Sequence, residues 1–246
     1  MAFRTPFTAV VALLPLLAGC GRPASDGPTS VQPTLKATTL PPSAEAAPAT
    51  RVAPRSDRPR IIFLGDSLTA GLGLDVNDSF PSVIEQRLRH EGFDYDVVNA
   101  GVSGDTSAGG LRRLDWALSD GAPKILIVAL GGNDGLRGLP PEQLEANLAA
   151  IIERGQRDGL VVILAGMEAP PNFGADYTSG FRAVYPRLAK RYNTALIPFL
   201  LEGVAGNQAL NQGDGIHPNR RGAELVADLV WKALEPVVAQ ARASSR

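Results

Sequence analysis

Short apolar runs alternate along this chain with stretches in which apolar residues recur every three or four positions. Five runs have the length of a strand, at about 61–64, 95–98, 125–130, 161–164 and 195–198. Short runs without polar alternation are typical of strands that are buried on both faces of a sheet. The run at 125–130 is the most apolar, and we expect it at the centre of the sheet.

The intervening stretches have the spacing of amphipathic helices. Asp78 or Ser79 is available to cap the first helix, and Gly155 or Gly159 ends the third. The predicted helices cover about 81–90, 108–118, 140 to 155 or 159, 178–192 and 220–240. Strands that alternate with helices indicate βαβ crossovers. We therefore predict an α/β fold, with a parallel five-stranded sheet between two helical layers and ligands at the carboxyl ends of its strands.

The first residues follow a different pattern. A basic start is followed by an apolar run at 7–17 and by Ala18-Gly19-Cys20, which is the organisation of a secretory signal. The apolar run is shorter than the roughly 20 residues that span a bilayer. Residues 17–20 also resemble the lipobox of bacterial lipoproteins, in which the cysteine becomes the first mature residue and carries the lipid. An ordinary cleaved signal with a chance cysteine is the alternative.

We accordingly predict a lipoprotein signal peptide at 1–19 and a membrane anchor on lipidated Cys20. The residue after it is Gly21 and not aspartate, which by the same resemblance favours a periplasmic protein anchored to the outer membrane. Residues 20–58 are rich in Pro, Ala, Ser and Thr and have few large apolar side chains. Such a composition is typical of an extended tether. We therefore predict that residues 59–246 form the folded domain.

Composition excludes several functional classes. The chain has 24 basic and 25 acidic residues, so there is no basic excess that would suit a nucleic acid. It contains 2 histidines and 1 cysteine, too few for a zinc site of cysteines and histidines. One histidine, His90, lies among charged residues near a helix end, and we interpret it as a solvated side chain.

Three motifs fall where an open α/β sheet binds its ligands. Ser67, in the segment 65–71, directly follows the first strand, and Asn133, in Gly131-Gly132-Asn133-Asp134, follows the most apolar strand. Asp214 and His217 lie three residues apart before the last helix, a spacing at which the two side chains face each other in a helical turn. A serine, an imidazole and a carboxylate form a hydrolytic triad, and an amide N–H suits a developing oxyanion.

Taken singly, each motif has an ordinary structural explanation: a helix-capping serine, a Gly-Asn turn and a surface turn. Together they resemble the GDSL or SGNH hydrolases, in particular the lysophospholipase L1, acyl-CoA thioesterase I and arylesterase branch. The matching segments are 65–68, 98–107, 130–138 and 214–219. The resemblance covers the whole domain and implies the flavodoxin-like form of the α/β sandwich.

The resemblance also assigns roles. Ser67 would be the nucleophile, His217 its base and Asp214 the orienting carboxylate. The oxyanion hole would combine the backbone N–H groups of Ser67 and Gly104 with the amide of Asn133. Gly101 is the alternative to Gly104, but the family's donor aligns with the glycine before Asp-Thr. Two further aspartates, at positions 66 and 134, adjoin these residues, and we interpret both as stabilising loops.

The resemblance implies hydrolysis of acyl esters through an acyl-enzyme, with aryl esters, lysophospholipids and acyl thioesters as substrates. We expect this mechanism to need neither a metal nor an organic cofactor. The segments 135–139 and 170–174 would line an acyl groove for medium or long chains. Acyl-CoA is scarce outside the cytoplasm, so we favour oxygen esters and lysophospholipids. Two other classes remain open: a carbohydrate or peptidoglycan O-acetylesterase with a small pocket, and a non-catalytic surface binding module.

Overall fold

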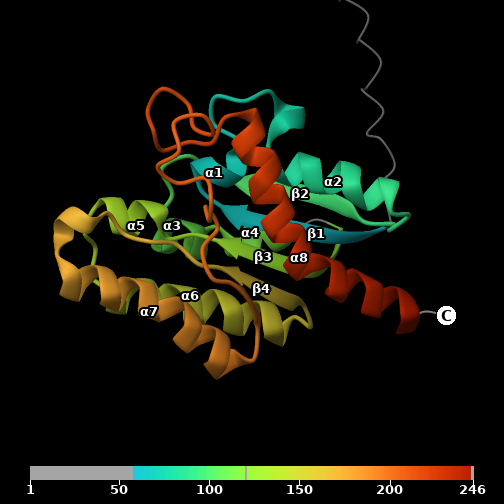
Figure 1. The fold of residues 1–246 in the computed structure, drawn as a ribbon. Helices are drawn as coiled ribbons and strands as arrows, with labels where there is room; N and C mark the ends of the chain where they lie inside the picture. The colour runs from blue at the N-terminus through green and yellow to red at the C-terminus, as the bar shows by residue number, and fades with distance from the viewer. Residues whose placement is uncertain (1–57, 120, 245–246) are drawn as a thin grey trace, which may run out of the picture. The chain divides into compact units, whose positions relative to one another are not determined.

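The computed structural model describes residues 58–119 and 121–244 (Figure 1). The predicted signal peptide at 1–19, Cys20 and, apart from its last residue, the predicted tether at 20–58 lie outside the described residues. The first strand begins at Pro59. Among the residues described, no helix is both long enough and apolar enough to cross a membrane.

The sheet has five parallel strands in the order β2-β1-β3-β4-β5. This confirms the predicted parallel five-stranded sheet and places the most apolar run, in β3, at its centre. The side chains of Ile61 to Leu64 in β1 have no exposed surface, as expected for a strand covered on both faces. The strands are β1 (Pro59–Gly65), β2 (Asp96–Gly101), β3 (Ala122–Ala129), β4 (Val161–Ala165) and β5 (Ala195–Ile197).

Helices cover both faces of the sheet and complete the predicted sandwich (Figure 1). One layer contains α2 (Phe80–His90) and α8 (Arg220–Ser244), which pack against each other. The other contains α3 (Ser107–Arg112), α6 (Pro141–Arg157) and α7 (Ala175–Tyr192), and α6 packs against both of the other helices. From β1 the chain adds β2 on one side of the sheet and then β3, β4 and β5 on the other. The strand order therefore reverses between the neighbouring strands β1 and β3, which form the topological switch point at which open α/β sheets bind ligands.

The predicted helix over 108–118 is two helices, α3 (Ser107–Arg112) and α4 (Leu114–Leu118). The break is at Arg113, whose φ of −103° and ψ of 8° are not helical. The prediction of one helix was wrong because the apolar spacing continues across the break. The cause is tertiary, since the Arg113 side chain bonds to the end of β1 and to the loop before α3.

Helix ends follow the expected capping chemistry. Ser79, and not Asp78, caps α2, because its hydroxyl accepts a hydrogen bond from the Ser82 N–H. Gly159 follows α6 with a φ of +77°, whereas Gly155 lies inside the helix, where a Cβ would come within 3.0 Å of Val162. Short elements follow the strands at the carboxyl edge of the sheet: α1 (Ser67–Ala70), η1 (Val76–Asp78), α5 (Gly132–Leu136) and η2 (Pro171–Phe173).

Candidate active site

The carboxyl edge of the sheet brings together the residues that the motifs predicted. Ser67 opens α1 directly after β1, Gly104 lies in the loop after β2, and Asn133 lies in α5 after β3. The loop before α8 adds His217 from the far end of the chain. All four residues line one cavity. The other histidine of the chain, His90, was predicted to be a solvated side chain, and it is exposed at the end of α2.

Ser67, His217 and Asp214 form a continuous chain of contacts. The Ser67 Oγ lies 2.8 Å from His217 Nε2, and His217 Nδ1 lies 2.6 Å from Asp214 Oδ2. The two ring nitrogens of His217 therefore have different partners, one a hydroxyl and the other a carboxylate. In this arrangement the imidazole accepts the hydroxyl proton at Nε2 while the carboxylate holds Nδ1–H.

The segment 214–217 is a loop and not the helical turn that the three-residue spacing predicts. Its ends are joined by a single antiparallel bridge between Asn211 and Pro218, and the Gln212 N–H donates to the His217 carbonyl at 2.7 Å. Gly215 occupies the turn with a φ of +70°, a conformation that favours glycine. The side chain of Asp214 faces His217 through this tight loop rather than along a helix face.

Asp214 accepts hydrogen bonds with both carboxylate oxygens. Oδ2 faces the His217 ring, while Oδ1 accepts from the backbone N–H groups of Ile216 at 2.9 Å and of His217 at 3.0 Å. The hydrogen bond from the His217 side chain, followed by those from the backbone, lowers the pKa of Asp214 from 3.8 to about 2. Asp214 is therefore a carboxylate at neutral pH, as the orienting partner of an imidazole needs to be.

Local contacts hold Ser67 at the start of α1. Asp66 caps this helix by accepting the Leu68 N–H at 3.0 Å. Asn99 of β2 donates its amide to the Thr69 carbonyl at 2.8 Å, which ties α1 to the neighbouring strand. A Cβ on Gly101 would come within 2.2 Å of the Ala70 nitrogen, so α1 approaches β2 closely because that strand ends in glycine.

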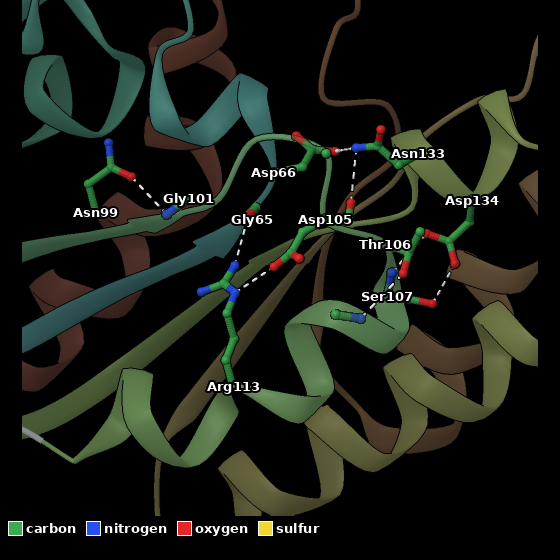
Figure 2. A network of polar contacts seen from close by, with 12 residues as sticks. Gly65, Asp66, Asn99, Gly101, Asp105, Thr106, Ser107, Arg113, Asn133 and Asp134 are labelled. Atoms are coloured by element: carbon green, nitrogen blue, oxygen red, sulfur yellow. Dashed lines mark hydrogen bonds and ion pairs between the residues drawn. The ribbon is translucent and has the colours of Figure 1, made fainter. Parts of the chain in front are cut away.

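The structure distinguishes between the two glycines proposed as oxyanion donors. The Gly101 N–H donates to Asn99 Oδ1 at 3.0 Å (Figure 2) and is not part of the cavity wall. Gly104 lines the cavity and has a φ of +83°. The Arg137 guanidinium donates to the Gly104 carbonyl at 3.0 Å and thereby fixes one side of this loop.

The Asn133 amide lies between two acceptors (Figure 2). Its nitrogen donates to the backbone carbonyl of Asp105 at 2.9 Å and, more weakly, to Asp66 Oδ2 at 3.4 Å. Asp66 is only 2% exposed, and this burial raises its pKa from 3.8 to about 6. The other aspartate beside the site, Asp134, accepts from the Ser107 N–H at 2.8 Å and from the Ser107 hydroxyl at 2.6 Å.

Sequence reasoning missed Arg113, Asp105 and Arg137 as neighbours of the site. Arg113 and Arg137 are basic residues in helical or loop segments, a pattern that is typical of solvated surface. Asp105 and Arg137 fall inside the matching segments 98–107 and 130–138, and this was the one signal that could have drawn attention to them. Arg113 and Arg137 each donate to a backbone carbonyl, a group that every residue possesses and that the sequence therefore does not reveal.

The cavity has a volume of about 580 Å³, within the usual range for small-molecule sites. Its wall is mainly apolar and is built by the segments that follow all five strands and by the loop before α8. Leu136 and Pro170 belong to the two segments expected to form an acyl groove. The apolar lining residues are Leu68, Leu72, Leu136, Met167, Ala169, Pro170, Pro171, Phe199, Leu201, Ala205 and Ile216.

Comparison with known proteins agrees with this geometry. The model of the GDSL-like Lipase/Acylhydrolase family matches residues 63–225, which include Ser67, Asn133 and the Asp214–His217 loop. The chain belongs to this family. As a member of it with close esterase relatives, the chain is a carboxylic ester hydrolase.

Three relatives of this GDSL-like hydrolase are informative. Esterase TesA of Pseudomonas aeruginosa is 45% identical over 178 residues, which cover 72% of this chain and 89% of the relative. Thioesterase 1/protease 1/lysophospholipase L1 of Escherichia coli is 39% identical, with coverage of 72% and 84%. The crystal structure of the esterase EstA from Pseudoalteromonas sp., inhibited by monoethylphosphonate, is 32% identical and superposes with a TM-score of 0.69, with coverage of 73% and 98%.

Proposed function

We propose that this chain hydrolyses medium- and long-chain acyl oxygen esters, including lysophospholipids, with Ser67 as nucleophile, His217 as general base and Asp214 as the orienting carboxylate. The observation that carries the proposal is the Ser67–His217–Asp214 chain of contacts at 2.8 and 2.6 Å, placed on the wall of an apolar cavity of about 580 Å³. Aryl esters and acyl thioesters also offer an acyl carbonyl that Ser67 can attack, and they are further substrates of this mechanism.

The reaction has two steps. Ser67 Oγ attacks the carbonyl carbon while its proton passes to His217 Nε2, and collapse of the tetrahedral intermediate returns that proton to the departing alcohol. Water then gives a proton to His217 and attacks the acyl-enzyme, and a second collapse releases the carboxylic acid and restores the Ser67 hydroxyl. Asp214 stabilises the imidazolium that forms in each step.

The negative charge of each intermediate falls on the former carbonyl oxygen. We propose that the backbone N–H groups of Ser67 and Gly104 and the amide of Asn133 bind this oxygen. The three residues line the same cavity from the ends of β1, β2 and β3. Ser67 occupies the first position of α1, where backbone N–H groups lack intrahelical partners. Donors held in place before the reaction stabilise charge without reorganisation.

Cavity size supports esters of longer acids over acetyl esters. An acetyl group needs little of a 580 Å³ cavity, whereas a longer acyl chain would cover apolar residues such as Leu136 and Ile216, which are 48% and 46% exposed. Each buried methylene contributes about 0.8 kcal/mol. The carbohydrate or peptidoglycan O-acetylesterase is the alternative within the same chemistry, and a non-catalytic binding module is the alternative outside it.

The test is a series of p-nitrophenyl esters from acetate to palmitate, run with the wild type and with Ser67→Ala. We expect kcat/KM to rise about four-fold for each methylene until the cavity is filled, from the energy of methylene burial, and the variant to lose a factor on the order of 10⁴–10⁶. Activity confined to acetate would favour the O-acetylesterase. A folded wild type that leaves a fluorophosphonate probe unreacted at Ser67 would indicate the binding module.

We further propose that the signal at 1–19 directs export of the chain and is cleaved before Cys20. Lipidation of Cys20 then anchors the protein to the outer membrane, with the folded domain in the periplasm. The support is the sequence pattern alone: a basic start, a short apolar run and a single cysteine at the lipobox position. Growth of producing cells with radiolabelled palmitate should label the wild type but not Cys20→Ser. An unlabelled wild type would rule out the anchor.

A further inference from the structure

A charged pair that the proposed mechanism does not use lies behind the proposed oxyanion hole. Arg113, at the break between α3 and α4, donates from Nε to Asp105 Oδ2 at 2.5 Å and from Nη2 to the Gly65 carbonyl at 2.8 Å (Figure 2). The side chains of Arg113 and Asp105 are only 16% and 18% exposed. One planar guanidinium thus joins the end of β1 to the loop before α3.

Both partners of Arg113 belong to segments that carry a proposed oxyanion donor. Gly65 ends β1, two residues before Ser67, and its carbonyl also accepts from the Val102 N–H at 3.0 Å. Asp105 directly follows Gly104. The third donor, Asn133, is tied to the same place because its amide donates to the Asp105 carbonyl. Arg113 therefore joins the end of β1 to the loop after β2, and Asn133 ties the segment after β3 to the same loop.

The pair is poorly arranged for stability alone. The second terminal nitrogen of Arg113, Nη1, is buried and has no hydrogen-bond partner among residues 58–119 and 121–244. Mostly buried ion pairs give up solvation that their mutual attraction does not fully replace, and apolar substitutes of similar volume are often as stable. An unmatched donor adds to this cost. The side chain also interrupts a helix whose apolar spacing would continue, so its position is better explained by the geometry that it imposes.

We infer that Arg113 is a positioning residue of the oxyanion hole, with Asp105 as its partner, an inference that rests on the proposed function of Ser67, Gly104 and Asn133. The rigid fork of the guanidinium sets the spacing between the Gly65 carbonyl and the Asp105 carboxylate. Through Asp105 it sets where Gly104 and the Asn133 amide stand relative to Ser67. A lysine at this position would supply the charge without the fork.

The experiment measures kcat and KM on a p-nitrophenyl ester for the full chain carrying Arg113→Met, Arg113→Lys or Asp105→Asn. We expect kcat to fall by roughly 10- to 100-fold in each, part of the 10²–10³ that loss of one oxyanion donor costs, with KM within about three-fold of wild type. Arg187→Met is the matched control, because it removes an ion pair of 2.5 Å with Glu145. Neither Arg187 nor Glu145 lines the cavity, so this variant should keep wild-type kcat.

The two charge-removing variants separate positioning from long-range electrostatics. If these residues acted only through long-range electrostatics, loss of the positive charge of Arg113 would weaken binding of the oxyanion. Loss of the negative charge of Asp105 would strengthen it. Positioning predicts that both variants lose kcat. A rise in kcat for Asp105→Asn would overturn the inference. If Arg113→Met fails to fold, Arg113→Lys and Asp105→Asn give the same test, and wild-type kcat in the folded variants would overturn it.

A double-mutant cycle with Asn133→Ala identifies the route of the effect. If Arg113 acts through the oxyanion hole, Arg113→Met should cost much less in the Asn133→Ala background than in wild type. Equal fold losses in the two backgrounds would show that Arg113 acts elsewhere and overturn the inference. Should Asn133→Ala alone keep wild-type kcat, the proposed oxyanion hole itself is wrong, and the inference fails with it for a different and recognisable reason.

Discussion

Asp66 is an acidic side chain that lies buried beside the candidate site. The residue is 2% exposed, and its carboxylate oxygens accept from the Leu68 N–H at 3.0 Å and from the Asn133 amide at 3.4 Å. Burial raises its pKa to about 6, so the folded protein retains this proton at pH values where the unfolded chain has lost it. Its ionisation therefore opposes folding at neutral pH.

We predict that Asp66→Asn changes the pH dependence of stability. Because the folded-state pKa of Asp66 lies above the unfolded value, its stabilising contribution is full below pH 3.8 and is lost as pH rises through about 6. Asparagine does not titrate but keeps an oxygen for the Leu68 N–H. From pH 4 to pH 7, the free energy of unfolding of the variant should rise relative to wild type by roughly 2–3 kcal/mol.

Urea unfolding of both proteins at several pH values measures this difference, and the slope, not the offset, is the quantity tested. Asp94→Asn is the control, since the Asp94 side chain is 77% exposed. A difference between Asp66→Asn and wild type that stays constant across the range would show that Asp66 ionises in the folded state as readily as in the unfolded chain.

At the residue scale, the sequence revealed the side chains whose chemistry is unusual. A scarce histidine at the position Asp214-x-x-His217 and an asparagine after paired glycines stand out because few structural roles require them. Arg113 did not stand out, because arginine in an amphipathic helical pattern is typical of solvent-facing positions. Its partner, the Gly65 carbonyl, lies 48 positions away and is a group that every residue possesses.

At the scale of elements, apolar runs predicted every strand. Burial on both faces gives the inner strands β1, β3 and β4 a continuous apolar signal, whereas the edge strands β2 and β5 are only partly buried and their runs are shorter or interrupted. The short helices α1 and α5, which carry Ser67 and Asn133, have 4 and 5 residues. A segment of this length completes hardly more than one helical turn, so it has no periodicity to read. The site is thus built from the elements that sequence patterns describe least, held by the elements that they describe best.

The contact between α1 and β2 makes a prediction at this scale. A Cβ at position 101 would lie 2.2 Å from the Ala70 nitrogen, a backbone atom that cannot turn aside as a flexible side chain would. Gly101→Ala should therefore push α1, and Ser67 with it, away from the sheet. We expect a loss of roughly 1–3 kcal/mol in the free energy of unfolding, as for other overpacked sites, and a fall in kcat.

Gly180→Ala is the matched substitution. Gly180 lies inside α7, its nearest neighbour for a new Cβ is Pro141 at 4.0 Å, and alanine there should raise the free energy of unfolding by roughly 0.5–1 kcal/mol with unchanged kcat. Thermal unfolding and ester hydrolysis measure both variants. Full activity in Gly101→Ala would mean that the position of Ser67 does not depend on this contact.

At the scale of the folded domain, the cavity is assembled from segments that are spread along the chain from Asp66 to His217. Leu68 follows β1, Leu136 follows β3, Met167 follows β4 and Ile216 precedes α8. The fold class implied that these segments meet at one edge of the sheet, since parallel strands share their carboxyl ends. The volume and the apolar character of the cavity depend on loop conformations and side-chain packing, which no pattern in the sequence specifies.

Two of these apolar side chains should determine acyl-chain preference without supporting the fold. Leu136 and Ile216 line the cavity but are 48% and 46% exposed, so truncating them removes little buried surface from the free protein. A long acyl chain would cover both, whereas an acetyl group held at Ser67 would not extend along the wall. We therefore predict that Leu136→Ala/Ile216→Ala lowers kcat/KM for long-chain esters while acetate hydrolysis and stability are preserved.

Each truncation removes apolar contact worth on the order of 1 kcal/mol to the acyl chain, so the double variant should lose about ten- to thirty-fold on a long-chain ester. The ratio of kcat/KM for p-nitrophenyl palmitate and acetate is the measurement. Val76→Ala is the control, because Val76 is 83% exposed and lies outside the cavity wall. An equal loss on both esters would place these side chains beside the reacting carbonyl, and an unchanged ratio would show that the acyl chain occupies another part of the cavity.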